Sequence, residues 1–247
     1  MSDVRHRLKS LLSRFILTRR RVPISRCYHY RGFRYGGFGG NLYEDYVIGL
    51  SKGRPLAELR STFASALLSC RPRTLAEALG ITLRVQSAWQ FPWNIAGEQL
   101  AVRDPRLNPD IVCHFCESGI LASHINREFR WLESAFESIK TLGFRPTEFG
   151  YLKCLELKGE HDSSYLVLDG NHRISALHAL GFTDVLVLVS PLAVRRSDVS
   201  TWPQVLGGTY TVDEALLVFD RYFRATNPPL TEMNPVSLII DEPPLWS

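Results

Sequence analysis

Residues 165–177 read YLVLDGNHRISAL, and this stretch decides our interpretation of the fold. The apolar run up to Leu168 is typical of a buried strand, and Ile174 and Leu177 are spaced as on one face of a helix. Only Gly170 makes the turn between the two patterns, so we expect a strand to pass directly into a helix. The first amides of a helix lack partners within it and lie at the positive end of its dipole. The junction therefore predicts an anion site.

The side chains at this junction are of the kinds that a phosphate site uses. Gly170 allows close approach of the backbone to a phosphate, and we expect the Arg173 guanidinium to face phosphate oxygens. His172 can donate a proton or a hydrogen bond near neutral pH. Asp169 can orient these groups or hold a divalent metal. In the alternative interpretation Asp169 caps the helix, His172 is a surface histidine with satisfied hydrogen bonds, and Arg173 pairs with a neighbouring acid.

The sequence on both sides of the junction predicts a mixed α/β (α+β) unit. Apolar residues recur three or four apart after residue 125, as on one face of a helix, and Gly143 is placed to end that helix. A polar turn separates two short apolar strands, which indicates a hairpin. The expected elements are a helix over 125–142, strands over 151–157 and 165–168, a helix over 171–180 and a fully buried strand over 185–189.

This order of elements resembles the ParB/sulfiredoxin superfamily. The resemblance covers about 65 residues and rests on Leu132, Ser138-Ile139, Gly143 and Pro146, followed by the hairpin and Asp169-Gly170-Asn171-His172-Arg173. In that family a Gly-x-x-Arg turn opens a helix and binds nucleotide phosphate. Asn171 stands where sulfiredoxins carry their cysteine nucleophile. The motif is most similar to the Asp-Gly-His-His-Arg of the free serine kinase group.

The resemblance implies a ligand, a metal and a set of roles. The ligand is a nucleoside tri- or diphosphate (ATP, ADP or CTP), bound by Gly170, Asn171, His172 and Arg173. Mg²⁺ would bind at Asp169. Catalysis would use Asp169, His172 and an earlier glutamate, for which Glu117 and Glu128 are candidates and Glu128 is our choice. The expected reaction is nucleotide-dependent phosphotransfer or hydrolysis, with a small-molecule or glycan-like acceptor.

Four regions follow from these patterns. They are a basic amphipathic segment (1–35), a region of weak pattern (36–110), the ParB/sulfiredoxin-like nucleotide-binding domain (111–192), and a helical and proline-rich extension (193–247). The second region is expected to hold an irregular loop over 31–46, helices over 54–70 and 73–80, and a strand over 81–85. In the extension, Thr211 and Glu214 form a capping box before a helix that reaches Phe223.

The positive charge is concentrated at the N-terminus. Residues 1–40 carry ten Lys and Arg and one acid, so their net charge is +9, whereas the whole chain has +4. An amphipathic helix over 4–18, followed by Arg19-Arg20-Arg21, would fit an anionic membrane surface through residues 4–21, or would instead pack on the domain. The body is mildly acidic, so we do not expect nucleic acid to bind. We expect a cytoplasmic protein, either without a membrane contact or peripheral on the inner face of a membrane.

Cysteine and tryptophan give weaker signals. Five cysteines and no secretory segment favour a reducing compartment. Cys113 and Cys116 form a C-x-x-C without a second matched pair, so we expect no zinc there. Trp131 is interpreted as a core or loop anchor.

The sequence is also compatible with two other functions. One is a DNA-associated regulator, although the 57 residues after Ser190 predict no helix-turn-helix domain. The other is a catalytically silent nucleotide-binding module at a membrane surface. Nucleotide turnover would separate this module from an enzyme.

Overall fold

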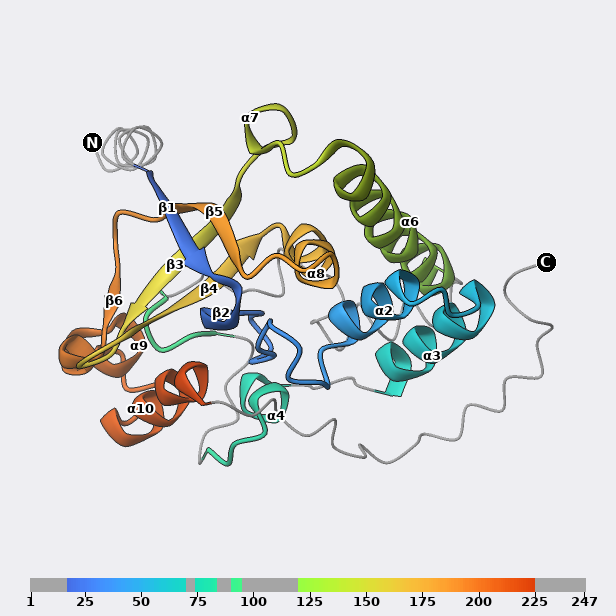
Figure 1. The fold of residues 1–247 in the computed structure, drawn as a ribbon. Helices are drawn as coiled ribbons and strands as arrows, with labels where there is room; N and C mark the ends of the chain where they lie inside the picture. Colours follow the sequence, from blue (N-terminus) through green and yellow to red (C-terminus); the bar gives the residue numbers. More distant parts are fainter. Residues whose placement is uncertain (1–16, 70–73, 84–89, 95–119, 225–247) are drawn as a thin grey trace, which may run out of the picture.

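The computed structural model describes residues 17–69, 74–83, 90–94 and 120–224 (Figure 1). Most of the predicted helix over 4–18, the pair Cys113 and Cys116, Glu117 and the tail from residue 225 lie outside these ranges. No helix in the described part of the chain combines the length and the apolar character needed to cross a membrane.

A six-stranded mixed sheet forms the centre of the fold, as the α/β prediction requires. Its order is β1-β5-β3-β4-β2, with β6 also beside β3. β3 and β4 form the predicted antiparallel hairpin, whereas β5 and β6 run parallel to β3 beside its two ends. The strands are β1 (Thr18–Pro23), β2 (Cys27–Tyr28), β3 (Leu152–Lys158), β4 (Ser163–Asp169), β5 (Asp184–Val189) and β6 (Val194–Arg195).

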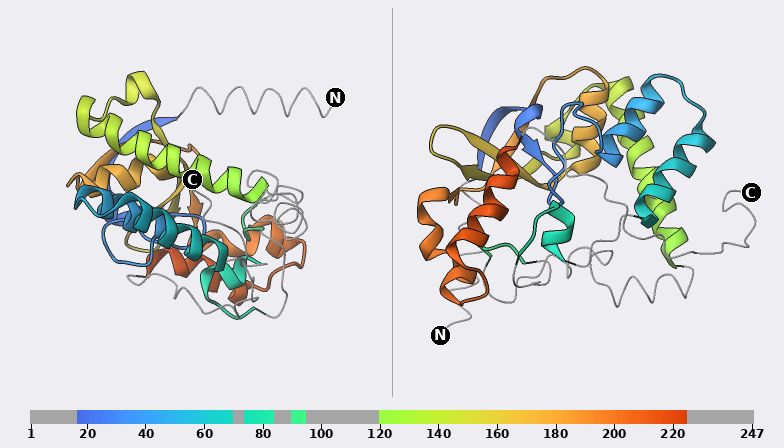
Figure 2. Two further views of the ribbon diagram at one scale, coloured as in Figure 1. Left: turned by 90° about the vertical axis from the view of Figure 1, so that its right-hand side faces the viewer. Right: turned by 90° about the horizontal axis from the view of Figure 1, so that it is seen from below.

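Helices cover both faces of this sheet (Figures 1 and 2). One face is covered by α2 (Leu42–Ser51), α3 (Leu56–Ser69), α6 (Ile120–Leu142) and α8 (Asn171–Ala179), and the other by α4 (Leu75–Leu79), α9 (Pro203–Leu206) and α10 (Val212–Asp220). Successive residues of a strand point to opposite faces. Accordingly Val167 of β4 belongs to the first core and Leu166 to the second. The sheet therefore separates two apolar cores.

Several predicted elements are confirmed. The helix predicted over 125–142 is α6, and it ends before Gly143, whose φ is +77°. The helices predicted over 54–70 and 73–80 are α3 and α4, and Thr74 caps α4 through the Glu77 amide. The capping box of Thr211 and Glu214 opens α10, which is followed by the 3-10 turn η5 (Arg221–Phe223).

Other local predictions are wrong. The loop predicted over 31–46 ends at Asn41, whose side chain accepts from the Tyr43 amide and begins α2. Ile81–Leu83 is not a strand, and the remainder of that prediction lies outside the described residues. β5 is not fully buried, because its residues alternate between buried and half-buried positions.

The N-terminal arginines have a different place from the one expected. Arg19, Arg20 and Arg21 do not end a helix but lie in β1, which pairs along its whole length with β5. Their side chains are exposed, and Arg20 Nη1 lies 3.1 Å from Glu156 Oε1. Both β1 and β2, which come from the segment predicted over 1–35, therefore belong to the same sheet as β3, β4 and β5.

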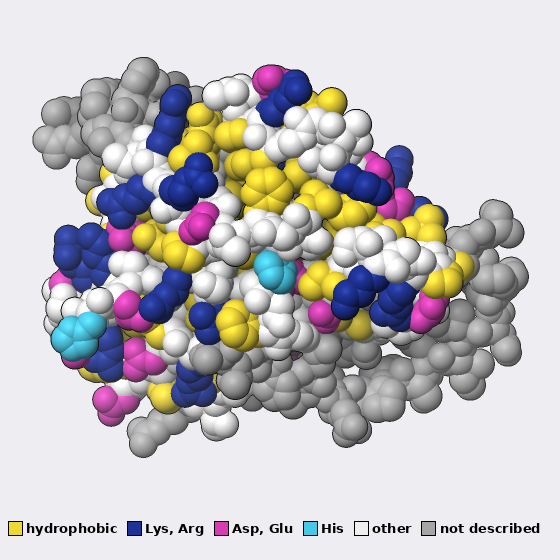
Figure 3. Space-filling view, in the orientation of Figure 1, with side chains coloured by type: hydrophobic (Ala, Val, Ile, Leu, Met, Phe, Trp, Pro, Cys, Tyr) yellow, Lys and Arg dark blue, Asp and Glu magenta, His cyan; other side chains and the backbone are white. Residues whose placement is uncertain are grey.

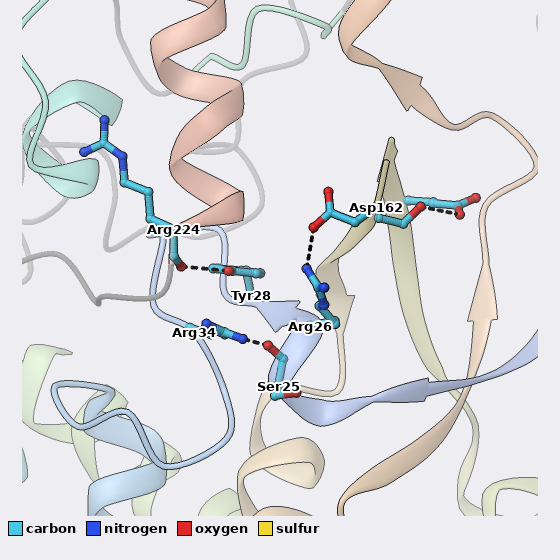
Figure 4. A network of polar contacts seen from close by, with 8 residues as sticks. Ser25, Arg26, Tyr28, Arg34, Asp162 and Arg224 are labelled. Atoms are coloured by element: carbon cyan, nitrogen blue, oxygen red, sulfur yellow. Dashed lines mark hydrogen bonds and ion pairs between the residues drawn. The ribbon is translucent and has the colours of Figure 1, made fainter. Parts of the chain in front are cut away.

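Polar contacts fix the chain between β1 and α2 to the rest of the fold (Figure 4). Arg26, in the turn η1 (Ile24–Arg26), forms an ion pair of 2.6 Å with Asp162 in the β3–β4 turn. The Tyr28 hydroxyl donates to the Arg224 carbonyl at 2.9 Å, and Arg34 Nε donates to the Ser25 carbonyl. The bonds of Arg26 and Tyr28 join segments that are far apart in the sequence, whereas the bond of Arg34 closes the loop between β1 and α2 on itself.

The turn between β4 and α8 requires glycine for two separate reasons. Gly170 has a φ of +102°, and a Cβ atom added there would lie only 2.7 Å from Leu152 Cγ. Gly181, just after α8, has a φ of +88° but no atom within 4 Å of its Cβ position. An alanine would therefore be strained in its backbone at both positions, but only at Gly170 would it also collide with a neighbouring side chain.

We expect Gly181→Ala to lower the free energy of unfolding by about 1–2 kcal/mol, through backbone strain alone. Gly170→Ala should cost about 1–3 kcal/mol more, because Leu152 must move. Urea denaturation followed by circular dichroism measures both. Equal losses in the two variants would show that the Leu152 contact does not restrict this turn.

Candidate functional site

The candidate site is the first turn of α8, directly after the last residue of β4. Gly170 is the N-cap residue, and no side-chain hydrogen bond from it caps the helix. The three residues that follow point to three different segments of the fold. This arrangement leaves the site surrounded by α6, by the segment before α2 and by the segment before β3.

His172 contacts α6 through a buried carboxylate. Its Nε2 lies 2.8 Å from Oε2 of Glu128, although the two residues are 44 positions apart. Only 2% of the Glu128 side chain is exposed, against 24% for His172. The structure therefore joins two residues that the sequence analysis named separately. A carboxylate hydrogen-bonded to an imidazole at a surface is an arrangement that suits acid–base chemistry.

Aromatic rings lie on two sides of the same imidazole. The buried Tyr43 ring is 5.7 Å from the His172 ring centroid in an edge-on arrangement, and the Trp131 ring is 5.5 Å away. Trp131 is 47% exposed and lies within α6, so its interpretation as a core or loop anchor is wrong. Together with Glu128, these rings restrict the orientation of His172.

Asn171 connects α8 with the segment before α2. Its Oδ1 accepts a hydrogen bond of 2.7 Å from the buried Tyr35 hydroxyl. The Asn171 carbonyl also accepts from Ser175 Oγ at 2.9 Å. The side chain therefore has a structural partner, and its position depends on a residue outside the region of the family resemblance.

Arg173 is oriented differently from the prediction. Its guanidinium donates to the carbonyls of Phe149, at 3.1 Å, and of Gly150, after the short helix α7 (Pro146–Phe149). Its Nη2 also lies 3.6 Å from Asp169 Oδ2. Arg173 thus orders the segment before β3 because that segment offers two backbone acceptors. Its charge still lies beside the start of α8.

Asp169 lies at the end of β4 with its side chain about half exposed. Besides Arg173, Lys153 Nζ lies 4.0 Å from its carboxylate. The described residues contain no group of three or more His, Cys, Asp or Glu that could hold a metal ion by themselves. Mg²⁺ that arrives with phosphates, however, commonly uses only one or two protein carboxylates. Asp169 would take part in that mode as a single carboxylate, with the phosphates as further ligands, and the described residues form no metal cage.

A second buried carboxylate, missed from the sequence, supports the same helix. Glu44 of α2 is 1% exposed and accepts from the Gly36 and Gly37 amides at 2.8 and 3.1 Å. His178 Nδ1, in the last turn of α8, lies 3.1 Å from Glu44 Oε1. The sequence signal for this residue is a glutamate that follows a glycine-rich run and lies in the first turn of a helix. The predicted loop over 31–46 includes Glu44, so its place in a helix was not recognised.

The face of the molecule around α8 is partly apolar. In Figure 3, apolar side chains gather below α7, between the sheet and α6, with charged groups at the border. A separate open cavity of about 580 Å³ lies at the β3–β4 turn. Its walls include Asp162, which is paired with Arg26, and Arg196, which is paired with Asp220. These two charged side chains are therefore already engaged within the protein.

No family model, no curated protein and no solved structure was found to match this chain.

The contact between His178 and Glu44 predicts a pH-dependent stability. The Glu44 carboxylate raises the pKa of His178, against the opposing effect of burial. A raised pKa in the folded state stabilises the fold below the unfolded-state pKa of about 6.5. This contribution disappears as the pH rises through the folded-state pKa.

We therefore expect His178→Gln to lower the free energy of unfolding at pH 6 by on the order of 1–2 kcal/mol. At pH 8.5 the loss should be smaller, because the wild-type imidazole is then neutral. Urea denaturation at both pH values measures the difference. A loss that does not depend on pH would mean that His178 contributes only as a neutral side chain.

Proposed function

We propose that this chain binds a nucleotide of the ATP, ADP or CTP type at the start of α8 and transfers or hydrolyses its phosphoryl group. The observation that carries the proposal is the pair of His172 and the buried Glu128, held beside uncapped helix amides. The resemblance to the ParB/sulfiredoxin superfamily supports the same assignment. The acceptor would be a small molecule or a glycan-like compound.

Phosphate binding would rest on the backbone at the start of α8. The amides of the first turn and the helix dipole attract anions. Gly170 makes the tight turn that places these amides directly after β4, where a Cβ atom would collide with Leu152. Arg173 and Lys153 add positive charge beside Asp169, within 4.0 Å of its carboxylate. Mg²⁺, when bound with the phosphates, would neutralise charge as it develops on the transferred group.

Proton transfer would be the task of His172. When Nε2–H donates a hydrogen bond to Glu128 Oε2, the neutral ring carries its lone pair on Nδ1. Nδ1 can then take the proton from an acceptor hydroxyl, or from water, as the oxygen attacks the phosphorus. The bond from phosphorus to the leaving nucleotide breaks in the same step. Glu128 acts through His172 and is therefore a positioning residue, whereas the resemblance implies that it takes part in catalysis directly.

This proposal predicts that His172→Gln separates binding from turnover. Glutamine can still donate a hydrogen bond to Glu128, but it cannot take up a proton. We expect nucleotide affinity to stay within about threefold, which corresponds to less than 1 kcal/mol, while turnover falls by roughly 10²- to 10⁴-fold. Isothermal titration with ATP, ADP and CTP in the presence of Mg²⁺, together with phosphate release, measures both quantities.

The matched control is His161→Gln, an exposed histidine in the β3–β4 turn, which should change neither quantity. Circular dichroism confirms folding of both variants. A wild-type protein that binds none of the three nucleotides would contradict the proposal. Binding without turnover would instead favour the silent nucleotide-binding module.

A further inference from the structure

Trp131 is placed where a reacting molecule would contact it. Its ring centroid lies 5.5 Å from that of His172, and nearly half of the residue is exposed. It follows Glu128 by three positions in α6, so both residues lie on neighbouring parts of one helix surface. Tryptophan side chains are, on average, largely buried. The exposure of the Trp131 indole beside the proposed proton acceptor, His172, therefore needs an explanation.

The indole is held in place by its neighbours. The exposed Arg127, one helical turn earlier, has its Cζ 5.9 Å from the Trp131 ring. A cation within about 6 Å of a ring centroid attracts the ring, and this one lies over the indole. The indole and the imidazole are tilted by 46° and do not stack flat on each other. Trp131 therefore offers an oriented apolar surface next to a group that exchanges protons.

We propose that Trp131 is the platform for the phosphoryl acceptor, and that the acceptor is a cyclic polyol of the pyranose class. This inference rests on the proposed function, because it assigns His172 to the acceptor hydroxyl. A pyranose ring has an apolar C–H face, which suits an indole, and hydroxyls around its rim. The guanidinium of Arg127 carries only hydrogen-bond donors, which match hydroxyl oxygens.

The geometry favours the acceptor over the nucleotide base as the occupant. The transferred phosphate would lie at the α8 amides, and the attacking oxygen must reach His172 Nδ1. A ring lying on Trp131 brings its rim hydroxyls to the imidazole. One hydroxyl would lose its proton to His172 and form the new oxygen–phosphorus bond as the nucleotide leaves. A nucleobase has no hydroxyl for this step.

Saturation-transfer NMR on the full chain tests the platform without requiring turnover. The probes are methyl β-D-glucopyranoside, methyl β-D-galactopyranoside and glycerol, with ATP and Mg²⁺ measured separately. We expect saturation of the pyranoside ring protons, little for glycerol, loss in Trp131→Ala and retention in Trp131→Phe. Phe182→Ala, which removes an exposed aromatic ring just after α8, is the matched control and should behave as wild type.

The outcomes separate this inference from the proposed function. Absence of pyranoside signals, or signals that persist in Trp131→Ala, would overturn the platform, even if ATP binds. Loss of adenine proton saturation in Trp131→Ala would also overturn it, because the base would then occupy the indole. If pyranosides bind through Trp131 but no nucleotide binds, the proposed function fails and the carbohydrate contact stands without it.

Discussion

The hydrogen bond between His172 and the buried Glu128 carboxylate is the contact on which the arrangement around α8 depends. A carboxylate that is 2% exposed is costly to bury without partners, and the bond to His172 ties α8 to α6 at this point. Asn171 and Arg173, on either side of His172, bond to two further segments. Three consecutive side chains therefore fix one helix start relative to three parts of the chain.

The rest of the fold supports this helix start from both sides. Strand β4 leads into it and is held between β3 and β2, so the position of Asp169 is set by the sheet. The last turn of α8 is held by His178 and Glu44, and Glu44 in turn holds the glycine-rich segment at Gly36 and Gly37. The helix is thus fixed at its two ends by two buried carboxylates. The proposed phosphate site would benefit from such rigidity.

Local sequence patterns predicted most of the elements near the site and few of the contacts between them. The hairpin, α6, α8 and β5 were found because each carries a clear apolar period and ends at a glycine or a polar turn. The roles of β1 and β2 could not be predicted, because pairing partners more than 130 residues away leave no local signal. The orientation of Arg173 could not be predicted either. It donates to backbone carbonyls, which every residue carries, so the sequence does not mark its acceptors. His172 and Glu128 were both candidates, but only the packing of α6 on α8 brings them together.

The proposed nucleotide site at the start of α8 can be tested by the change in backbone amide shifts when ATP and Mg²⁺ are added to isotopically labelled protein. We expect the largest changes at the amides of Asn171, His172 and Arg173, with smaller ones at the Trp131 indole N–H. Changes confined to the β3–β4 turn around residues 159–163, where the open cavity lies, would contradict this proposal.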